Sequence, residues 1–199
     1  KNPANDLLSA IANAEINGEK LSDEFLDGSW LLIIFAGNDT TRNTMSGGIK
    51  LLHENHKQKE MLIDNLELLP NFINETVRCV SPVIHMRRTS LEETEINGQK
   101  IGPYEKIALW YGAANRDPSV FEDPNKFNIL RDNADKHLAF GIGRHTCIGK
   151  PVALMQLREF YSQFLVRFQD FEMNGDWKVA PNNFVHAIQE MPIKYSPEN

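Results

Sequence analysis

Cysteine is scarce in this sequence: its 199 residues include two, Cys79 and Cys147. The two form no Cys-x-x-Cys pair, which excludes a disulfide-rich scaffold. An iron–sulfur cluster needs more cysteines than the chain has. A chain with so few thiols fits a reducing compartment, and we expect a cytoplasmic protein.

Long apolar runs and an excess of positive charge are also missing. The longest apolar run, residues 30–37, is too short to cross a bilayer. The first twenty residues lack the apolar core and the cleavage site of a secretory signal. The formal net charge is -6, which argues against a general nucleic-acid binder. We therefore expect no membrane span and no nucleic-acid partner.

Helical periodicity is the strongest pattern that the sequence does contain. Between about Leu21 and Leu51, apolar or small residues recur every three or four positions, which predicts one long helix that Ser22 caps. Gly37 lies in its middle, where glycine costs about 1 kcal/mol relative to alanine. We expect a groove beside the helix to use the space that the missing side chain leaves.

A second helix is expected from Pro70 to Val80. Proline suits the first turn of a helix, and Pro82 stops the pattern at the other end. Glu75 and Arg78 lie three residues apart on one side of this helix, so their side chains can reach each other.

The pattern after residue 82 changes to short strands, a long loop, a helix and a final strand. Strands are expected at residues 83–90, 94–96, 99–101 and 107–111, a loop at 115–136, a helix after residue 147 and a strand at 183–195. Asn97-Gly98 predicts a type I′ turn between two of the strands. The fold class is therefore mainly α with a small β portion.

Cys147 stands in a glycine-rich stretch just before the expected last helix. Gly141, Gly143 and Gly149 allow the backbone to fold tightly around the sulfur. The positive end of the following helix stabilises a thiolate at this place. Such a thiolate can serve as a nucleophile, a metal ligand or a heme ligand, and a buried structural cysteine in a turn is the alternative.

The residues around Cys147 bear on each of these roles. A cysteine hydrolase needs His145 as its base, and no residue that orients this base is evident. A zinc site needs at least three ligands, and only His145 is near in sequence. Residues 141–146 begin like a dinucleotide-binding loop but carry Thr146 in place of the third glycine. Heme needs a single protein sulfur, and a thiolate ligand favours cleavage of the oxygen–oxygen bond.

Four motifs resemble those of the cytochrome P450 family. Phe140-x-x-Gly143-x-His145-x-Cys147-x-Gly149 is similar to the family's heme-binding signature. Residues 36–41 (Ala-Gly-Asn-Asp-Thr-Thr) resemble its oxygen-activation segment, residues 75–78 (Glu-Thr-Val-Arg) resemble its glutamate–arginine motif, and Arg131 falls where an arginine completes a triad with them. The matched region covers essentially all of the chain.

The resemblance implies a heme site. Cys147 becomes the proximal ligand to the iron of heme b (iron protoporphyrin IX), and Phe140 packs near its sulfur. The other heme contacts that the resemblance implies are Gly143, Gly149, His145, Arg88, Ala36 and Gly37, with His145 and Arg88 at positions that bind propionates. The resemblance assigns proton transfer to Asp39 and Thr40. It also implies that Glu75, Arg78 and Arg131 form an ionic network that supports the cysteine loop.

The resemblance also implies an activity and its partners. A soluble bacterial monooxygenase of this kind hydroxylates a hydrophobic substrate, such as an alkane, a fatty acid or a steroid side chain, with dioxygen. The residues that the resemblance places against the substrate are Ile33, Ala36, Val83, Ile84 and Val185. Electrons come from a ferredoxin or flavodoxin with its reductase, and Arg144 and Lys150 beside the loop can contact an acidic partner.

The length of the chain departs from the family, whose members are considerably longer. Residues 1–199 are therefore expected to form a single partial domain, the carboxy-terminal, heme-binding half of the cytochrome P450 fold, with the amino-terminal half absent. The alternative function is that of a truncated heme-binding module without catalytic activity.

Overall fold

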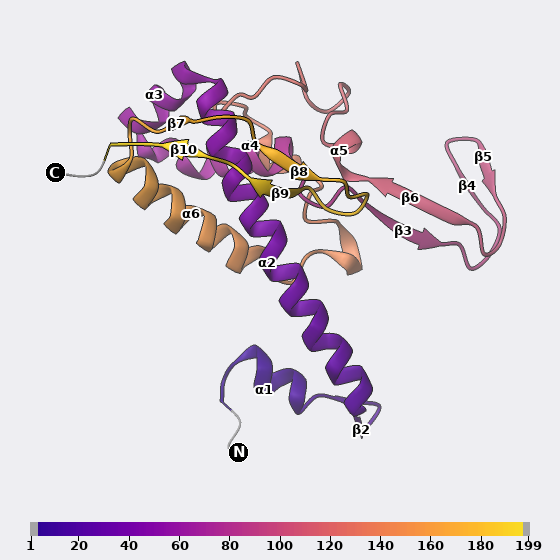
Figure 1. The fold of residues 1–199 in the computed structure, drawn as a ribbon. Coiled ribbons are helices and arrows are strands. Elements are labelled where there is room, and N and C mark those ends of the chain that lie inside the picture. The colour runs from indigo at the N-terminus through magenta and orange to yellow at the C-terminus, as the bar shows by residue number, and fades with distance from the viewer. Residues whose placement is uncertain (1–3, 197–199) are drawn as a thin grey trace. The chain divides into compact units, whose positions relative to one another are not determined.

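The computed structural model describes residues 4–196 and divides the chain into two compact units, Lys1–Asn38 and Asp39–Asn199 (Figure 1). The described residues form mainly helices, with five two-stranded sheets. This confirms the predicted fold class. No helix within the described residues is long and apolar enough to cross a membrane.

The first unit holds a short helix, a hairpin and the start of a long helix. Its elements are α1 (Leu7–Ala12), β1 (Glu15–Ile16), β2 (Glu19–Lys20) and the beginning of α2 (Asp23–Glu54). Asn17 and Gly18, both with positive φ, close the hairpin. Neither α1 nor this hairpin is predicted from the sequence.

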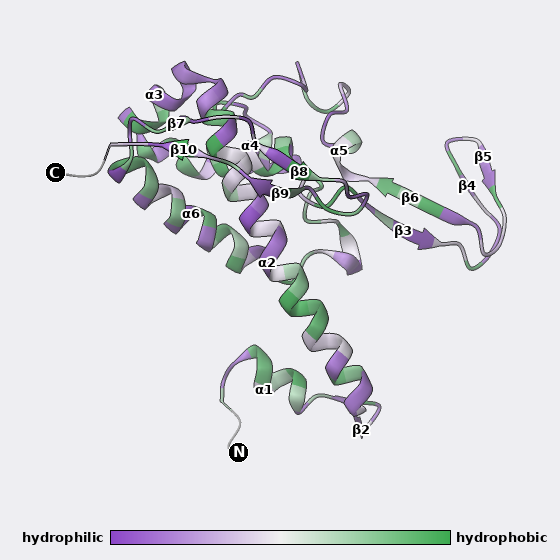
Figure 2. Ribbon diagram, viewed as in Figure 1, coloured by the Kyte–Doolittle hydropathy of each residue, from purple (hydrophilic) through white to green (hydrophobic). Residues whose placement is uncertain are grey.

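Helix α2 is the predicted long helix. The Phe25 N–H donates to Ser22 Oγ at 3.2 Å, so Ser22 caps the helix as predicted. The apolar run 30–37 forms the green turns of α2 in Figure 2. A Cβ atom added at Gly37 would meet nothing within 4 Å, so the helix surface is open there.

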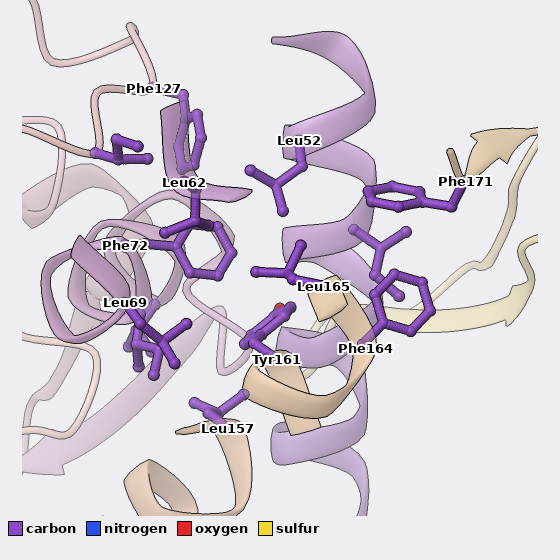
Figure 3. Packing of buried hydrophobic residues seen from close by; sticks show 14 residues of the cluster. Leu52, Leu62, Leu69, Phe72, Phe127, Leu157, Tyr161, Phe164, Leu165 and Phe171 are labelled. Carbon is purple, nitrogen blue, oxygen red and sulfur yellow. The ribbon is translucent and has the colours of Figure 1, made fainter. Parts of the chain in front are cut away.

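The core of the second unit lies between the later turns of α2, helix α4 and helix α6 (Figure 3). The helices added in this unit are α3 (His56–Asp64), α4 (Leu69–Val80), α5 (Tyr111–Ala114) and α6 (Lys150–Arg167), with 3-10 turns η1 (Leu66–Leu68), η2 (Ala134–Lys136) and η3 (Gly143–His145). Leu52, Phe72 and Tyr161 are completely buried there. Tyr161 and Phe72 pack edge to face, with ring centroids 4.7 Å apart.

Helix α4 begins and ends as its prolines indicate. The helix begins at Leu69, one residue before the predicted start, so Pro70 is its second residue and lies in the first turn. Ser81 ends the helix in a left-handed conformation (φ 43°), and its N–H donates to Val77 O at 2.9 Å. Pro82 then prevents the helix from continuing.

Four strands form the arm that extends from the second unit in Figure 1. They are β3 (His85–Thr89), β4 (Thr94–Ile96), β5 (Gln99–Ile101) and β6 (Lys106–Trp110), with β3 antiparallel to β6 and β4 antiparallel to β5. Asn97 and Gly98 have φ of 49° and 80°, which confirms the type I′ turn.

The predicted final strand at 183–195 is interrupted. It consists of β9 (Ala187–Glu190) and β10 (Ile193–Lys194), which pair with β8 (Lys178–Ala180) and β7 (Glu172–Met173), respectively. The prediction of one continuous segment is wrong because Pro192, which has no N–H to donate to a ladder, separates the two strands.

Candidate functional site

The loop before α6 wraps around its own backbone and presents the sulfur of Cys147. Gly141 and Gly143 have φ of 70° and 68°, and a Cβ atom at Gly141 would lie 3.0 Å from the carbonyl oxygen of His145. The Cys147 N–H donates to the carbonyl oxygen of Phe140 at 2.8 Å. The Cys147 side chain is exposed, so the turn leaves the thiol accessible to a bound group.

Helix α6 starts directly behind this thiol. Gly149 is its N-cap, and the Lys150 N–H donates to Cys147 O at 3.3 Å. A Cβ atom at Gly149 would stand 3.8 Å from Cys147 Sγ, so glycine keeps the space beside the sulfur clear. The positive end of an 18-residue helix therefore lies next to the position where a thiolate would carry its charge.

Phe140 connects the loop to the core. It is half-buried against the core cluster of the second unit, and its ring centroid lies 5.6 Å from that of His137. Lys150 Nζ lies 5.5 Å from the same ring. These contacts hold the residue whose carbonyl accepts the Cys147 N–H.

Cys79, the other cysteine, is unsuited to binding a metal. It is half-buried beside Glu75, and burial, followed by the charge of Glu75, raises the pKa of the Cys79 thiol to about 12. The thiol therefore stays protonated at neutral pH, whereas thiolates are the species that bind metals. Cys147 is the better of the two ligands.

The surroundings of Cys147 fit a heme better than a zinc ion or a hydrolase centre. Among residues 4–196, no group of three or more histidine, cysteine or acidic side chains is placed to hold a metal ion. In the same part of the chain, the His145 ring is exposed and no hydrogen bond joins it to Cys147 Sγ, so the geometry gives no support to the nucleophile–base pair of a hydrolase. A porphyrin supplies four donors of its own and needs one exposed protein sulfur, which the loop offers.

Asp39 and Thr40 lie on α2 in the same unit as the loop. Asp39 is partly exposed and forms an ion pair with Arg42 at 3.0 Å. The carbonyl of Thr40 accepts the hydroxyl of Thr44 at 2.8 Å, a contact that tends to bend a helix. Ile33, Ala36 and Gly37 belong to the first unit, where Ile33 is half-buried and the other two are exposed.

The arm and the carboxy-terminal strands bring three of the predicted substrate residues together. Val83 and Val185 form an antiparallel bridge. The Ile84 N–H donates to the carbonyl of Phe184 at 2.8 Å. Arg88 is half-buried on β3, and four residues along an extended segment place it on the same side as Ile84.

Glu75, Arg78 and Arg131 meet in one buried network. Glu75 is fully buried and accepts Arg78 Nε at 2.7 Å and Arg131 Nε at 3.1 Å. The two guanidinium groups also donate to carbonyl oxygens of residues 115–136, called the irregular segment below. The accepting carbonyls are those of Asn115, Glu122, Asp123, Pro124 and Lys126. The network therefore fixes a segment that has almost no regular structure.

Sequence reasoning missed Asn115, which is completely buried in this segment. Its backbone carbonyl accepts Arg78 Nη1 at 2.7 Å, and its side chain reaches the loop before Cys147. Nothing in the sequence pattern marks it, because an asparagine beside Arg116 and Asp117 is typical of an exposed turn.

Comparison with known proteins places these features in a family. The family model described as Cytochrome P450 matches residues 50–196. The chain belongs to the cytochrome P450 family. The heme iron that this family's fold binds fits the exposed sulfur of Cys147 and the glycine-folded loop around it.

Individual P450 relatives align with nearly all of this chain. It is 38% identical over 197 residues to linalool 8-monooxygenase of Pseudomonas putida, covering 99% of this chain and 48% of that protein. It is 39% identical to steroid C26-monooxygenase of Mycolicibacterium smegmatis, covering 98% and 49%. The structure of cytochrome P450 CYP268A2 of Mycobacterium marinum in complex with pseudoionone is similar, with a TM-score of 0.92, 37% identity, and coverage of 97% and 47%. The chain spans about half the length of the curated relatives it matches.

Proposed function

We propose that this chain is the heme-binding part of a monooxygenase that hydroxylates a hydrophobic substrate. The exposed sulfur of Cys147, on a glycine-folded loop at the start of α6, is the observation that supports this proposal most strongly. The reaction is R–H + O₂ + 2 electrons + 2 protons → R–OH + H₂O. When bound, the heme supplies the redox chemistry that activates dioxygen.

The loop and the arm supply the heme contacts in this proposal. Cys147 binds the iron of heme b as a thiolate, and the first turn of α6 stabilises its negative charge. His145 and Arg88 bind the propionates with their cationic or N–H groups. Gly143 and Gly149 add no side chain beside the sulfur: a Cβ atom at Gly143 would project into open space, and one at Gly149 would lie 3.8 Å from Cys147 Sγ.

Asp39 and Thr40 handle protons in this proposal. The Asp39 carboxylate is partly exposed and paired with Arg42, so in this proposal it forms the solvent end of the proton path. The Thr40 hydroxyl, on the next residue, passes a proton onward to the reaction site. Substitution of either residue lowers turnover while heme binding is retained.

The substrate is an apolar molecule such as an alkane, a fatty acid or a steroid side chain. Ile33, Ala36, Val83, Ile84 and Val185 are the residues we propose to contact it. The bridge between Val83 and Val185 supports this, because it joins two of these apolar residues from distant parts of the chain. The names of two relatives, linalool 8-monooxygenase and steroid C26-monooxygenase, also describe oxidation of largely apolar molecules.

Electrons come from a separate ferredoxin or flavodoxin with its reductase. Arg144 and Lys150 are exposed on either side of Cys147 and can bind an acidic protein. Such a contact brings the electron donor close to the loop that carries the iron ligand.

The deciding experiment is the absorption spectrum of the carbon monoxide adduct of the reduced protein, expressed at its full natural length. A strongly red-shifted Soret band shows thiolate ligation, and Cys147→Ser removes it. Cys79→Ser is the matched control and keeps the band, because Cys79 faces Glu75 and Arg78. A wild-type protein without the red-shifted band contradicts the proposal.

Turnover then separates an enzyme from a heme-binding module. A medium-chain fatty acid or alkane, supplied with surrogate ferredoxin and reductase, is expected to give an alcohol. Thiolate ligation without product from any of the apolar substrate classes favours the non-catalytic module.

A further inference from the structure

Asn115 forms hydrogen bonds both to the buried ionic network and to the segment that leads into the cysteine loop. It follows α5 directly, and its N–H donates to the carbonyl of Tyr111 at 2.9 Å. Its own carbonyl accepts Arg78 Nη1 at 2.7 Å. Arg78 in turn is held by Glu75, so the backbone of Asn115 is fixed by the network.

The side-chain amide of Asn115 makes two further bonds. Its Nδ2 donates to Ser81 Oγ at 2.8 Å, and its Oδ1 accepts the N–H of Leu138 at 2.6 Å. The amide orientation follows from the partners, because a backbone N–H can only donate. Ser81 Oγ donates to the carbonyl of Arg78, which leaves the Ser81 oxygen to accept from Nδ2.

Leu138 is the first residue of the turn that carries the ligand loop. Its carbonyl accepts the N–H of Gly141 at 2.8 Å, and Phe140 within this turn accepts the N–H of Cys147 at 2.8 Å. Hydrogen bonds, connected by short stretches of backbone, therefore link Arg78 through Asn115 and the 138–141 turn to Cys147.

We infer that Asn115 is a positioning residue for the iron ligand: its Oδ1 holds Leu138 so that the Phe140–Cys147 turn keeps the sulfur in place for heme. This inference rests on the proposed function. Two features of Asn115 support it. The residue is completely buried, and the short bond to Leu138 is made by a side chain rather than by a helix or sheet ladder.

Asn115→Leu tests the inference because leucine has a similar volume and no acceptor for the Leu138 N–H. Hydrogen-bond partners behind a metal ligand typically change affinity by about 10- to 100-fold. We expect heme transfer to apomyoglobin to be faster by at least about tenfold, with a larger fraction of the reduced carbon monoxide adduct lacking the red-shifted band. Both readouts are independent of turnover.

Two further variants isolate the contact to Leu138. Ser81→Ala removes the partner of Nδ2, together with the bond from Ser81 Oγ to the carbonyl of Arg78, and leaves the Leu138 contact in place. Asn115→Asp keeps an oxygen for Leu138 while losing the Nδ2 donor. Both are expected to keep the wild-type spectrum and to lose heme within about threefold of the wild-type rate, a small change beside that expected for Asn115→Leu. If Asn115→Leu does not fold, as judged by its circular dichroism, the Asn115→Asp variant decides. A rate of heme loss about tenfold above the wild-type rate in that variant overturns the inference.

Asn133→Leu is the matched control. Asn133 lies in the same irregular segment and donates its Nδ2 to the carbonyl of Val120 at 2.7 Å, a bond within this segment rather than to the cysteine loop. It is expected to retain heme as wild type does. Wild-type heme retention and spectrum in Asn115→Leu overturn the inference, whereas a wild-type protein without thiolate ligation overturns the proposed function instead.

Discussion

Glu75 accepts hydrogen bonds from Arg78 and Arg131 at a place that solvent does not reach. Burial, the largest single influence, lowers the pKa of the Arg78 guanidinium, but its hydrogen bonds to Glu75 together with the charges of Cys79 and Glu75 outweigh burial and hold that pKa above its ordinary value. Removing one partner from a buried network leaves charges uncompensated, so Glu75→Gln is expected to lower the free energy of unfolding by about 3–5 kcal/mol. Denaturant titration measures this loss. Glu122→Gln, on an exposed residue of the same segment, is the control, and equal stability of the two variants contradicts the prediction.

His137 makes stability depend on pH. Burial, followed by the charge of Lys150, lowers the pKa of the His137 imidazole from 6.5 to about 4. Between these values the unfolded chain binds a proton and the folded chain does not, so stability is complete above pH 6.5 and falls as the pH drops toward 4. The full loss is about 3 kcal/mol.

His137→Asn removes this acid dependence because an amide does not titrate. The amide oxygen can still accept the Ala139 N–H that the histidine ring accepts now. Unfolding curves measured at several pH values between 4 and 7 check the prediction. The control is His56→Asn, on an exposed residue, which is expected to keep the wild-type slope. A variant at position 137 with an unchanged slope is inconsistent with this account.

Two glycines of α2 are expected to respond oppositely to alanine. A Cβ atom at Gly48 would overlap the Tyr161 hydroxyl and lie 2.9 Å from Thr76 Cγ2, so Gly48→Ala forces α2 away from its neighbours and costs about 1–3 kcal/mol. Gly37→Ala meets no atom and gains up to about 1 kcal/mol of helix propensity. Thermal unfolding of the two variants measures both effects. Equal shifts in the same direction refute the assignment of Gly48 to a tight helix contact.

The elements that could be predicted are those that a local sequence pattern specifies. Helix α2, helix α4 and the turn at Asn97-Gly98 each have a periodicity or a dipeptide that specifies them without the rest of the fold. Asn17-Gly18 carries the same turn signal, although its flanking strands have two residues each and no apolar alternation to draw attention. Helix α3 has a polar sequence, and it is recognisable only once Leu62 is seen in the core.

The candidate site divides in the same way. Cys147 and its glycines form one contiguous motif, and Glu75 and Arg78 are neighbours on a helix, so both can be found by reading along the chain. Asn115 is joined to Leu138 across 23 positions, and its carboxamide contacts arise only from tertiary packing. Its importance therefore could not be read from residue spacing.

At the scale of the whole molecule, many large apolar side chains are exposed. In the first unit Leu31, Leu32 and Ile34 are 71%, 64% and 69% exposed, and in the second unit α6 exposes Val152 and Met155. Exposed apolar side chains in such number favour association. We expect the 199-residue chain to form oligomers, measured by light scattering after size-exclusion chromatography.

Charge placed on this surface should reverse the association. Leu31→Glu combined with Ile34→Glu is expected to shift the chain toward monomer. Leu91→Glu, on an exposed leucine between β3 and β4 of the arm, is the control and leaves the distribution unchanged. A wild-type chain that is monomeric at high concentration contradicts the prediction.

The contact of Tyr161 with α2 has a consequence for engineering. The phenol donates to the carbonyl oxygens of Thr44 and Met45, at 3.1 and 2.9 Å, and Gly48 offers it no side chain. Burial raises the pKa of the Tyr161 hydroxyl far above its usual range, so this donor keeps its proton even in alkaline buffer. Libraries that diversify the side chains of α2 around Thr40 therefore leave this backbone anchor, and with it the separation of the two helices, intact.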